Sequence, residues 1–439
     1  MNDNIVHKKK TIDLISKKKA RIGIIGLGYV GLPLAILFAK KGFKIFGFDN
    51  DIKKIKSLKK NYSYIERISN EKITLLNKNG NKCYSNYQKI EECDVIIICV
   101  PTPLKGRNIP DLSYIKDTIK NILRYIKKGQ TIILESTSYP GTTEEEIVKK
   151  INKRFIIGVN FFVGFSSERI NPGINENNIS LIPKVVSGYS SSCLEIVSKV
   201  YQKVFSTIVK ANTIKIAEFS KLLENIYRAV NIGFINEMKF VADKMGIDIF
   251  EILKIANTKP YGFRRFNPGP GIGGHCIPID PHYLYWKAKK IGISANFIKL
   301  SADTNCNVIN FIKTKIYQII KSLKIKKDKT KILILGFAYK KNMDDVRESA
   351  SLKLAETLKK NNFKNLAYYD PHISNKIIEN KYKFIKKINN LSPSLIKKFD
   401  ITILMTDHDI FDYKMIKKHS KKIIDCRGRY RTDNKVLRG

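Results

Sequence analysis

Residues 21–31 read Arg21-Ile-Gly-Ile-Ile-Gly-Leu-Gly-Tyr-Val-Gly31, an apolar run that leads into the pattern G-x-G-x-x-G. The run predicts a buried strand, and the glycines Gly26, Gly28 and Gly31 predict a tight turn that opens a helix. Glycine lets the backbone approach a pyrophosphate closely, and the N–H groups of the first helical turn, where Val30 lies, attract the anion. This stretch therefore predicts a dinucleotide-binding unit of strand, turn and helix.

A carboxylate follows where such a unit needs one. Asp49 ends the next predicted strand, about 20 residues after the glycines, where it can accept hydrogen bonds from the adenosine ribose. The same carboxylate repels a 2′-phosphate, which favours NAD over NADP, and Lys54 can reach the same ribose or phosphate. Thr102 follows a later strand, in the turn Val100-Pro-Thr-Pro103, and comes to the sheet edge where open sheets bind ligands.

Along the chain, short apolar runs alternate with longer amphipathic stretches, which is typical of strand–helix units that build a parallel sheet. A long helical stretch at residues 213–245, with further helices toward residue 323, interrupts this alternation. It predicts a connector and a dimer surface, with an intramolecular core helix as the alternative. After a charged linker at residues 324–331 the alternation resumes. Strands are expected at residues 21–26, 44–48, 95–100, 131–135, 185–188, 331–336, 366–369, 401–405 and 422–425.

The fold class that follows is α/β, with two Rossmann-like doubly wound parallel-sheet domains joined by a central helical domain with a long helix. At 439 residues the chain is long enough to bury several cores. The expected parts are a basic N-terminal extension at residues 1–19, a first doubly wound domain at 20–210, a helical domain at 211–323 and a second doubly wound domain at 324–439.

Charge and cysteine usage narrow the class of protein. A net charge of +42 could neutralise nucleic-acid phosphates, but the lysines are scattered through every predicted helix without an arginine-rich stripe. We therefore expect a solvated basic surface and no nucleic-acid partner. The seven cysteines are odd in number and widely spaced, with no Cys/His cluster at metal-ligand spacing, which indicates a reducing compartment and no metal.

Neither a membrane span nor a secretory signal is expected. The uncharged run at residues 22–39 is interrupted by three glycines and Pro33, so it favours a strand, a turn and a buried helix. The lysines near the N-terminus enclose no apolar core of the kind that a signal peptide has. A cytoplasmic protein is the expectation.

One cysteine stands out by its surroundings. Residues 267–280 read Asn267-Pro-Gly-Pro-Gly-Ile-Gly-Gly-His-Cys-Ile-Pro-Ile-Asp280, so Cys276 follows a loop of small and rigid residues. Such a loop lets the backbone pack closely against a ligand. With Asp280 nearby, Cys276 is a candidate nucleophile.

Together these stretches resemble the UDP-glucose / UDP-N-acetylhexosamine 6-dehydrogenase family, from about residue 20 to the end of the chain. The family implies two nucleotide-binding domains around a helical core, with NAD in the first and the UDP moiety largely in the last. The motifs that carry the resemblance are Gly26–Gly31, Glu135-Ser-Thr-Ser-Tyr-Pro-Gly-Thr-Thr143, Ser167-Glu-Arg-Ile-Asn-Pro-Gly173, Lys221-Leu-Leu-Glu-Asn225, Gly269–Asp280, and Gly336-Phe-Ala-Tyr-Lys-Lys341 with Arg347-Glu-Ser.

The resemblance also implies roles for single residues. Cys276 resembles the nucleophile that captures the aldehyde as a thiohemiacetal, which a second hydride transfer converts to a thioester. Lys221 and Asn225 resemble the residues that stabilise the oxyanion, and their spacing of four places both on one helix face. Asp280 and Thr137 resemble residues that position water and the lysine. Glu168 resembles the carboxylate that helps to hydrolyse the thioester.

Binding residues are implied in the same way. Lys340 and Arg347 resemble cation contacts to the UDP and NAD phosphates respectively, and Arg427 resembles a ribose contact. Arg264 and Arg265 are both candidates for an arginine that a partner subunit supplies. The expected cofactor contacts are Gly26, Gly28, Val30, Gly31, Asp49, Lys54, Thr102, Thr137 and Arg347. The expected substrate contacts are Glu168, Arg169, Lys221, Asn225, Arg265, Phe266, Gly273, Lys340 and Arg427.

Departures from the family pattern favour one substrate. Pro172 stands where UDP-glucose enzymes carry a second glutamate, and Ile279 replaces a common lysine. The motifs Ser167-Glu-Arg-Ile-Asn-Pro-Gly173 and Gly273-Gly-His-Cys-Ile-Pro-Ile-Asp-Pro281 most resemble the branch that acts on UDP-N-acetylglucosamine, which would feed uronate precursors to a surface polysaccharide. Ser167 stands where a proline is usual, which bears on the local backbone and not on the role of Glu168. UDP-glucose and UDP-N-acetylmannosamine are the alternative substrates, and a nucleotide-binding regulatory protein is the non-enzyme alternative. A homodimer or a higher homo-oligomer is expected.

Overall fold

The computed structural model describes residues 3–65, 67–78, 80–106, 108–169, 176–274, 276–374 and 382–439. It divides into two compact units. The first holds the described residues up to Glu224 together with Trp286–Ile291, and the second holds Asn225–Tyr285 together with Gly292–Gly439.

Eight strands of the first unit form one sheet, among the residues that are described, in the order β10-β9-β8-β7-β4-β1-β2-β3. All neighbouring pairs are parallel except β8 and β9. The strands of this unit are β1 Arg21–Ile25, β2 Lys44–Phe48, β3 Lys82–Tyr84, β4 Val95–Ile98, β7 Thr131–Leu134, β8 Phe162–Ser166, β9 Lys184–Gly188 and β10 Ile208–Lys210, with a small hairpin of β5 Leu104–Lys105 and β6 Ile109–Pro110.

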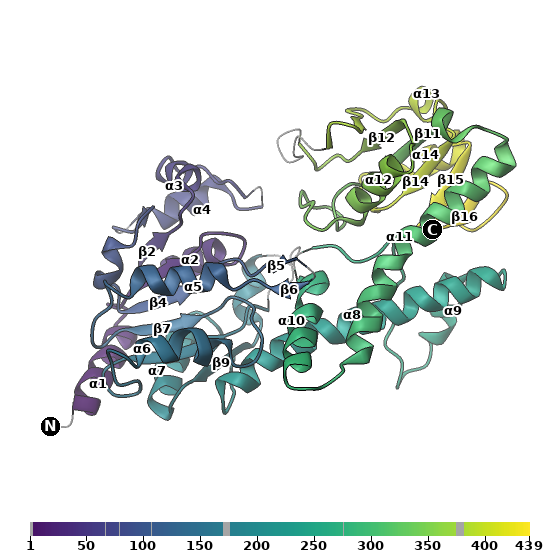
Figure 1. The fold of residues 1–439 in the computed structure, drawn as a ribbon. Coiled ribbons are helices and arrows are strands. Elements are labelled where there is room, and N and C mark those ends of the chain that lie inside the picture. The colour runs from purple at the N-terminus through teal and green to yellow at the C-terminus, as the bar shows by residue number, and fades with distance from the viewer. Residues whose placement is uncertain are drawn as a thin grey trace. The chain divides into compact units, whose positions relative to one another are not determined.

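Helices cover this sheet because its strands are apolar on both faces. All four residues of β4, Val-Ile-Ile-Ile, are buried. Helices α2 and α7 pack against strands of the sheet (Figure 1). The helical segments are α1 Asp3–Ser16, α2 Gly31–Lys40, α3 Ile52–Lys59, α4 Asn70–Leu76, η1 Gln88–Glu92, α5 Ser113–Ile122, η2 Glu144–Val148, α6 Lys149–Ile151, η3 Glu176–Leu181 and α7 Ser191–Gln202.

The basic segment at residues 1–19 contains helix α1, which packs against α7 and the core of the first unit. Ile15 is fully buried, and the Thr11 hydroxyl donates to the carbonyl of Gly129 at 3.0 Å. Lys8 pairs with Glu195 of α7 at 2.5 Å. Helix α1 therefore packs as part of the first unit.

The second unit carries a six-stranded parallel sheet within its described residues, in the order β13-β12-β11-β14-β15-β16. Its strands are β11 Lys331–Leu335, β12 Asn365–Tyr369, β13 Lys386–Lys387, β14 Ile401–Leu404, β15 Lys422–Asp425 and β16 Val436–Arg438. Its other segments are α9 Ile249–Ala256, α11 Asn296–Leu323, η4 Lys327–Lys329, α12 Ala350–Lys360, α13 Pro393–Ile396 and α14 Tyr413–His419.

Two helices belong partly to each unit. Helix α8, Ile214–Lys244, crosses the boundary after Glu224, and α10, Cys276–Lys290, crosses it before Trp286. The expected long helix at residues 213–245 is thus confirmed as α8. Among the described helices, none has both the length and the apolarity that crossing a membrane requires. The uncharged run at residues 22–39 forms β1, the glycine-rich turn and most of α2.

The predicted strands are all present, whereas the prediction missed β3, β5, β6, β8, β10, β13 and β16. The strands β5 and β6 form a separate hairpin, and β3, β10, β13 and β16 are edge strands of two or three residues. All six are too short for a recognisable period. The buried strand β8 contains Gly164, where a Cβ would lie 2.5 Å from the carbonyl oxygen of Ser187. That glycine, which the close approach of β9 requires, interrupts the apolar run.

Candidate active site

The three glycines of the first turn differ in what surrounds them. Gly26 has φ +88°, and a Cβ there would lie 2.6 Å from the carbonyl oxygen of Cys99. A Cβ on Gly31 would lie 1.9 Å from the carbonyl oxygen of Gly26. At Gly28 a Cβ would meet nothing within 4 Å. Gly26 and Gly31 are therefore required by the fold of the turn, whereas Gly28 leaves open space beside its backbone.

That open space lies where a helix begins. Helix α2 starts at Gly31, and no side chain caps it at Val30. The positive end of the helix and the N–H groups of its first turn are suited to an anion such as a pyrophosphate. The residues present thus fit a dinucleotide.

Asp49 lies directly after β2 and is largely buried, with 7% of its surface exposed. Its Oδ2 accepts a hydrogen bond from the backbone N–H of Leu27 at 2.9 Å and lies 3.2 Å from Lys54 Nζ. The Tyr64 hydroxyl donates to the carbonyl of Leu27, and burial raises the pKa of Tyr64 well above its ordinary value. Asp49 and Tyr64 therefore bind the N–H and the carbonyl of Leu27, which lies within the glycine-rich turn.

Thr102 and Thr137 follow the carboxyl ends of β4 and β7, which are neighbours in the sheet beside β1. Thr102 is buried, and Thr137 is half-buried. The hydroxyl of Ser136 donates to the carbonyl of Val100 at 2.8 Å, which ties the two segments together. The structure thus brings both threonines to the sheet edge that carries the glycine-rich turn.

Lys221 of α8 reaches the segment that follows β8. Its ammonium donates to the backbone carbonyl of Glu168, and only 8% of the residue is exposed. The neighbouring Arg169 is held by Glu224, with Nη2 to Oε1 at 2.7 Å, and donates to the carbonyl of Pro183 at 3.0 Å. Lys221 therefore contacts the backbone of Glu168, while the guanidinium of Arg169 is bound by Glu224 and by the carbonyl of Pro183.

Glu218, one turn before Lys221 in α8, has a role that the sequence reading missed. Its Oε2 accepts from the N–H of Gly141 at 2.5 Å, and its Oε1 accepts from the N–H and the hydroxyl of Thr143 at 2.9 and 2.7 Å. The carboxylate thereby holds the loop that follows Thr137. The available signal was a single acidic residue on an otherwise apolar and basic turn of α8.

Burial raises the pKa of Glu218 to about 7. A carboxyl whose pKa is raised on folding favours the protonated form in the folded state, so its contribution to stability is lost as the pH rises from about 4.5 to about 7. We expect the wild type to gain on the order of 3 kcal/mol over Glu218→Gln as the pH falls through this window. Chemical unfolding at several pH values measures this difference.

The matched control for that experiment is Glu195→Gln, at an exposed position on α7. A difference between wild type and Glu218→Gln that stays constant with pH would show that Glu218 does not titrate in the folded protein.

Two further predicted catalytic residues are hydrogen-bonded to each other in the second unit. Asn225 Nδ2 donates to Asp280 Oδ2 at 2.5 Å, and both residues are buried, with 4% and 1% exposed. Asn225 lies one turn after Lys221 on the continuous helix α8. Cys276 is the first residue of α10, one turn before Asp280, but its side chain lies outside the described part of the structure.

Further predicted site residues lie in the loop of Gly273 and Gly274 and in the turn that begins at Gly336, after β11. A Cβ on Gly273 would lie 2.6 Å from Tyr339 Cβ, and the N–H of Gly274 donates to the carbonyl of Arg347 at 3.0 Å. The carboxylate of Asp345 accepts a hydrogen bond from the guanidinium of Arg347, with Nη2 to Oδ2 at 2.6 Å. Burial, reinforced by Arg228, lowers the pKa of Lys340. Lys340, Gly273 and Arg347 therefore belong to one set of packed loops.

The remaining predicted residues are spread over nearby loops of the second unit. Arg427 donates from Nε to the carbonyl of Met405 at 2.6 Å, and burial lowers its pKa. Arg264 and Arg265 are exposed, and Arg265 contacts Asn267 at 2.9 Å. The ring of Phe266 lies 5.9 Å from that of Tyr227.

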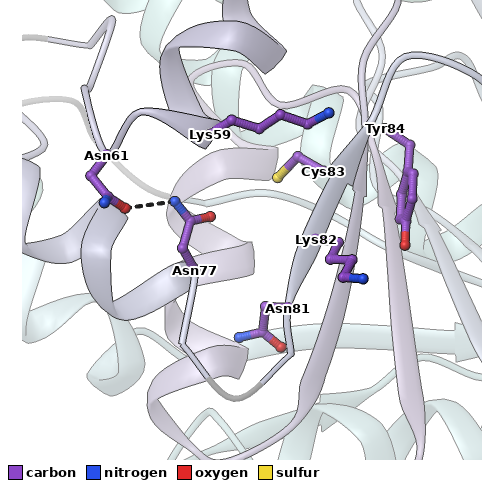
Figure 2. A pocket seen from close by; sticks show the side chains of 7 residues that line it. All are labelled: Lys59, Asn61, Asn77, Asn81, Lys82, Cys83 and Tyr84. Carbon is purple, nitrogen blue, oxygen red and sulfur yellow. Dashed lines mark hydrogen bonds between the residues drawn. The ribbon is translucent and has the colours of Figure 1, made fainter.

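A hollow of about 270 Å³ in the first unit is not part of this arrangement. Figure 2 shows the residues that line it, including the pair Asn61 and Asn77, which hydrogen-bond at 2.7 Å. Asn77 also donates to the carbonyl of Leu58, and Asn81 accepts from the N–H of Ile45. Its amides thus hold α3, α4 and β3 in place, and no predicted site residue lines it.

The chain matches three models of the UDP-glucose/GDP-mannose dehydrogenase family in chain order: the NAD binding domain at residues 20–205, the central domain at 215–307 and the UDP binding domain at 333–432. Protein CapL of Staphylococcus aureus is 36% identical over 410 residues, which cover 92% of this chain and 93% of CapL.

Two further similarities extend over most of the chain. The UDP-N-acetyl-D-glucosamine 6-dehydrogenase of Pseudomonas aeruginosa is 35% identical over 360 residues, which cover 81% of this chain and 84% of that protein. The solved structure of a UDP-D-ManNAc dehydrogenase from Pyrococcus horikoshii has a TM-score of 0.83 and 30% identity, over 94% of this chain and 96% of that one.

These matches agree with the geometry. The turn with its open face at Gly28 falls in the NAD binding domain, which confirms the predicted cofactor, and the Lys340 loop falls in the UDP binding domain. The chain therefore belongs to the UDP-glucose/GDP-mannose dehydrogenase family, and it is an NAD-dependent UDP-sugar dehydrogenase.

Proposed function

We propose that the protein oxidises C6 of UDP-N-acetylglucosamine from a primary alcohol to a carboxylate, in two oxidations between which Cys276 captures the aldehyde as nucleophile. The observation that carries the proposal is the buried pair of Asn225 and Asp280, one helical turn from Lys221 and one from Cys276. Fully buried polar side chains are retained in proteins when they are paired, and this pair lies on the two helices that bear the candidate lysine and cysteine.

The chemistry divides into oxidation, capture, oxidation and hydrolysis. Loss of the hydroxyl proton and of a hydride from C6 gives an aldehyde, to which the Cys276 thiol adds to form a thiohemiacetal. Loss of its hydroxyl proton and of a second hydride from C6 gives a thioester, and water then cleaves the carbon–sulfur bond, which releases the acid and restores the thiol. When bound, NAD supplies the acceptor for each hydride. The covalent bond to Cys276 prevents loss of the aldehyde between the two oxidations.

The surrounding residues assist at defined atoms. One N–H of the Asn225 amide is held by Asp280, and we assign its second N–H, with the Lys221 ammonium, to the C6 oxygen on which negative charge develops. Glu168, whose backbone carbonyl contacts Lys221, is assigned to the water that attacks the thioester. Lys340 and Arg427 are assigned to the UDP moiety, Arg347 to NAD, and Asp49 to the adenosine ribose.

The choice of sugar rests on similarity to relatives that are named for their substrates and on the residues that occupy two sequence motifs. The Pseudomonas relative is named for UDP-N-acetyl-D-glucosamine, whereas the Pyrococcus structure is named for UDP-D-ManNAc. Ile279 lies in α10, while Pro172 lies outside the described residues. UDP-N-acetylmannosamine and UDP-glucose are therefore the sugars against which the proposal is tested. The acid formed would supply the synthesis of a surface polysaccharide.

A panel of UDP-sugars distinguishes these substrates. We expect the highest kcat/KM with UDP-N-acetylglucosamine, and two NADH per sugar, because an alcohol loses four electrons on its way to an acid and each NAD accepts two. NADP should support little turnover, since Asp49 repels a 2′-phosphate. NADH absorbance and product mass measure both quantities. A higher kcat/KM with another UDP-sugar would reassign the substrate, and one NADH per sugar would exclude the two-step reaction.

We also propose that α8 pairs with a second copy of the chain. Six apolar side chains recur along the helix at spacings of three, four and seven, which places them on one face, and between 43% and 56% of each is exposed. They are Ile216, Phe219, Leu223, Tyr227, Phe234 and Val241. A continuous apolar stripe of this kind is typical of an interface between subunits.

A charge in the middle of this stripe should weaken the association. We expect Leu223→Glu to sediment as a monomer at concentrations where the wild type is a dimer or larger, because a buried unpaired carboxylate costs several kcal/mol. Ile156→Glu, at an exposed apolar position on the first unit, is the matched control. A wild type that sediments only as a monomer would refute the proposed interface.

A further inference from the structure

The turn that bears Lys340 accepts hydrogen bonds from the hydroxyls of Ser349, Ser351 and Thr406 at its carbonyls, and one carboxylate binds two of its N–H groups. Asp370 follows β12 and is 2% exposed. Its Oδ2 accepts hydrogen bonds from the backbone N–H groups of Phe337 and Ala338, at 2.6 and 2.8 Å. The start of the turn is therefore fixed two residues before Lys340.

A buried histidine fixes the other end of the turn. His408 follows β14 and is fully buried. Its Nδ1 lies 2.9 Å from the backbone N of Asn342, which donates, and its Nε2 lies 3.0 Å from Asp370 Oδ2. Through these two contacts His408 links the residues on either side of Lys340.

The donor at Asn342 determines which ring nitrogen of a neutral His408 carries the proton. A backbone N–H can only donate, so Nδ1 must accept and carries no proton. The proton of a neutral imidazole then sits on Nε2, where it donates to Asp370. A second proton on Nδ1 would face the N–H of Asn342, and that hydrogen bond would be lost.

We propose that His408 is a positioning residue for the substrate: in its neutral form it holds the turn of residues 336–342 so that Lys340 receives the pyrophosphate of the UDP-sugar, and its protonation releases the turn. The inference rests on the proposed role of Lys340 in binding UDP. Substrate affinity should therefore be lower when His408 carries a second proton and no longer accepts the hydrogen bond from Asn342.

Asp370, the acidic partner of His408, remains a carboxylate because its pKa is lowered. Burial acts to raise that pKa, but the contact with His408 and the hydrogen bonds from the backbone N–H groups of Ala338 and His372 together outweigh burial. His372 is the nearest other titratable ring, at 4.9 Å. On the loop of His408 itself, Asp409 pairs with Lys341, and the Tyr413 hydroxyl donates to the carbonyl of His408.

The test is direct binding of UDP-N-acetylglucosamine without NAD, by calorimetry between about pH 5.5 and about pH 8. Each phosphate of a UDP-sugar has one ester bond, one anhydride bond and a single strongly acidic proton, so the charge of the ligand is constant over this range. For the wild type we expect Kd to rise about tenfold toward the acid end, which corresponds to the loss of one buried hydrogen bond.

Three variants identify the titrating group. His408→Asn places an amide oxygen near the position of Nδ1, so it should bind nearly as tightly as the wild type at high pH and lose the acid weakening. His408→Ala should bind about tenfold more weakly at every pH. His372→Gln should keep the pH dependence of the wild type, as should His419→Gln, at the C-terminal end of α14.

The possible results separate the inference from the function beneath it. If the wild type binds no UDP-sugar of the panel at any pH, the proposed function fails, and the role of His408 with it. If the wild type binds equally well at all pH values, or if His408→Asn keeps the acid weakening, only the role of His408 is overturned. Loss of the pH dependence in His372→Gln would likewise overturn it.

Discussion

Replacing Cys276 by alanine is expected to lower the rate of uronate formation by a factor on the order of 10³ or more, because the aldehyde can then form no thiohemiacetal. Binding of NAD and of the UDP-sugar should be largely retained. At most one NADH should then appear per sugar. Steady-state turnover, calorimetric binding and the ratio of NADH to sugar together measure this result.

Two further variants sharpen the test of Cys276. Cys276→Ser keeps a weaker nucleophile whose ester hydrolyses slowly, so an acyl-enzyme should be visible by mass spectrometry. Cys306→Ala, at an exposed free cysteine of α11, is the matched control and should turn over like the wild type. If Cys276→Ala still makes uronate at close to the normal rate, Cys276 is not the nucleophile.

The second large effect is expected at the glycine-rich turn. A methyl group on Gly31 would lie 1.9 Å from the carbonyl oxygen of Gly26, which is backbone and cannot move aside without opening the turn. We expect Gly31→Ala to weaken NAD binding by a factor on the order of 100 or more and to destabilise the protein by about 3 kcal/mol. Fluorescence titration with NADH and chemical unfolding measure the two effects.

Gly28→Ala is the matched comparison because it adds the same methyl group where nothing lies within 4 Å. Its stability should be close to that of the wild type, while NADH binding weakens because the methyl group occupies the space assigned to the pyrophosphate. Undiminished NADH binding by Gly28→Ala would show that the pyrophosphate does not pass beside Gly28.

Local pattern was sufficient for most of the central strands. Strands β1, β4, β11 and β14 lie inside parallel sheets with helices on both faces, so each reads as an apolar run. Gly26 in the turn after β1 has φ +88°, and a Cβ on Gly31 would meet Gly26 five residues earlier, so the motif predicts the turn from local sterics. The contact of Gly26 with Cys99 is not local and did not follow from the motif. The edge strands β3 and β13 were missed because three and two residues, with lysine among them, make no recognisable pattern.

The candidate site was predictable in its residue types and not in its pairings. The spacing of Lys221 and Asn225 fixes their shared face, since a helix repeats every 3.6 residues. Their partners did not follow from spacing. Asn225 meets Asp280 at a separation of 55 residues, and Arg169 meets Glu224 at the same separation.

The sequence by itself determined the two doubly wound domains, the long helix, the NAD-binding turn and the chemical identity of the candidate residues, because each depends on short-range periodicity or on a contiguous motif. Only the tertiary structure decided which buried polar groups meet. Glu218 reaches Thr143 across 75 residues, and His408 reaches Asn342 across 66 and Asp370 across 38. Such contacts depend on the order of strands in a sheet, which brings the loops at one edge together however far apart they lie along the chain.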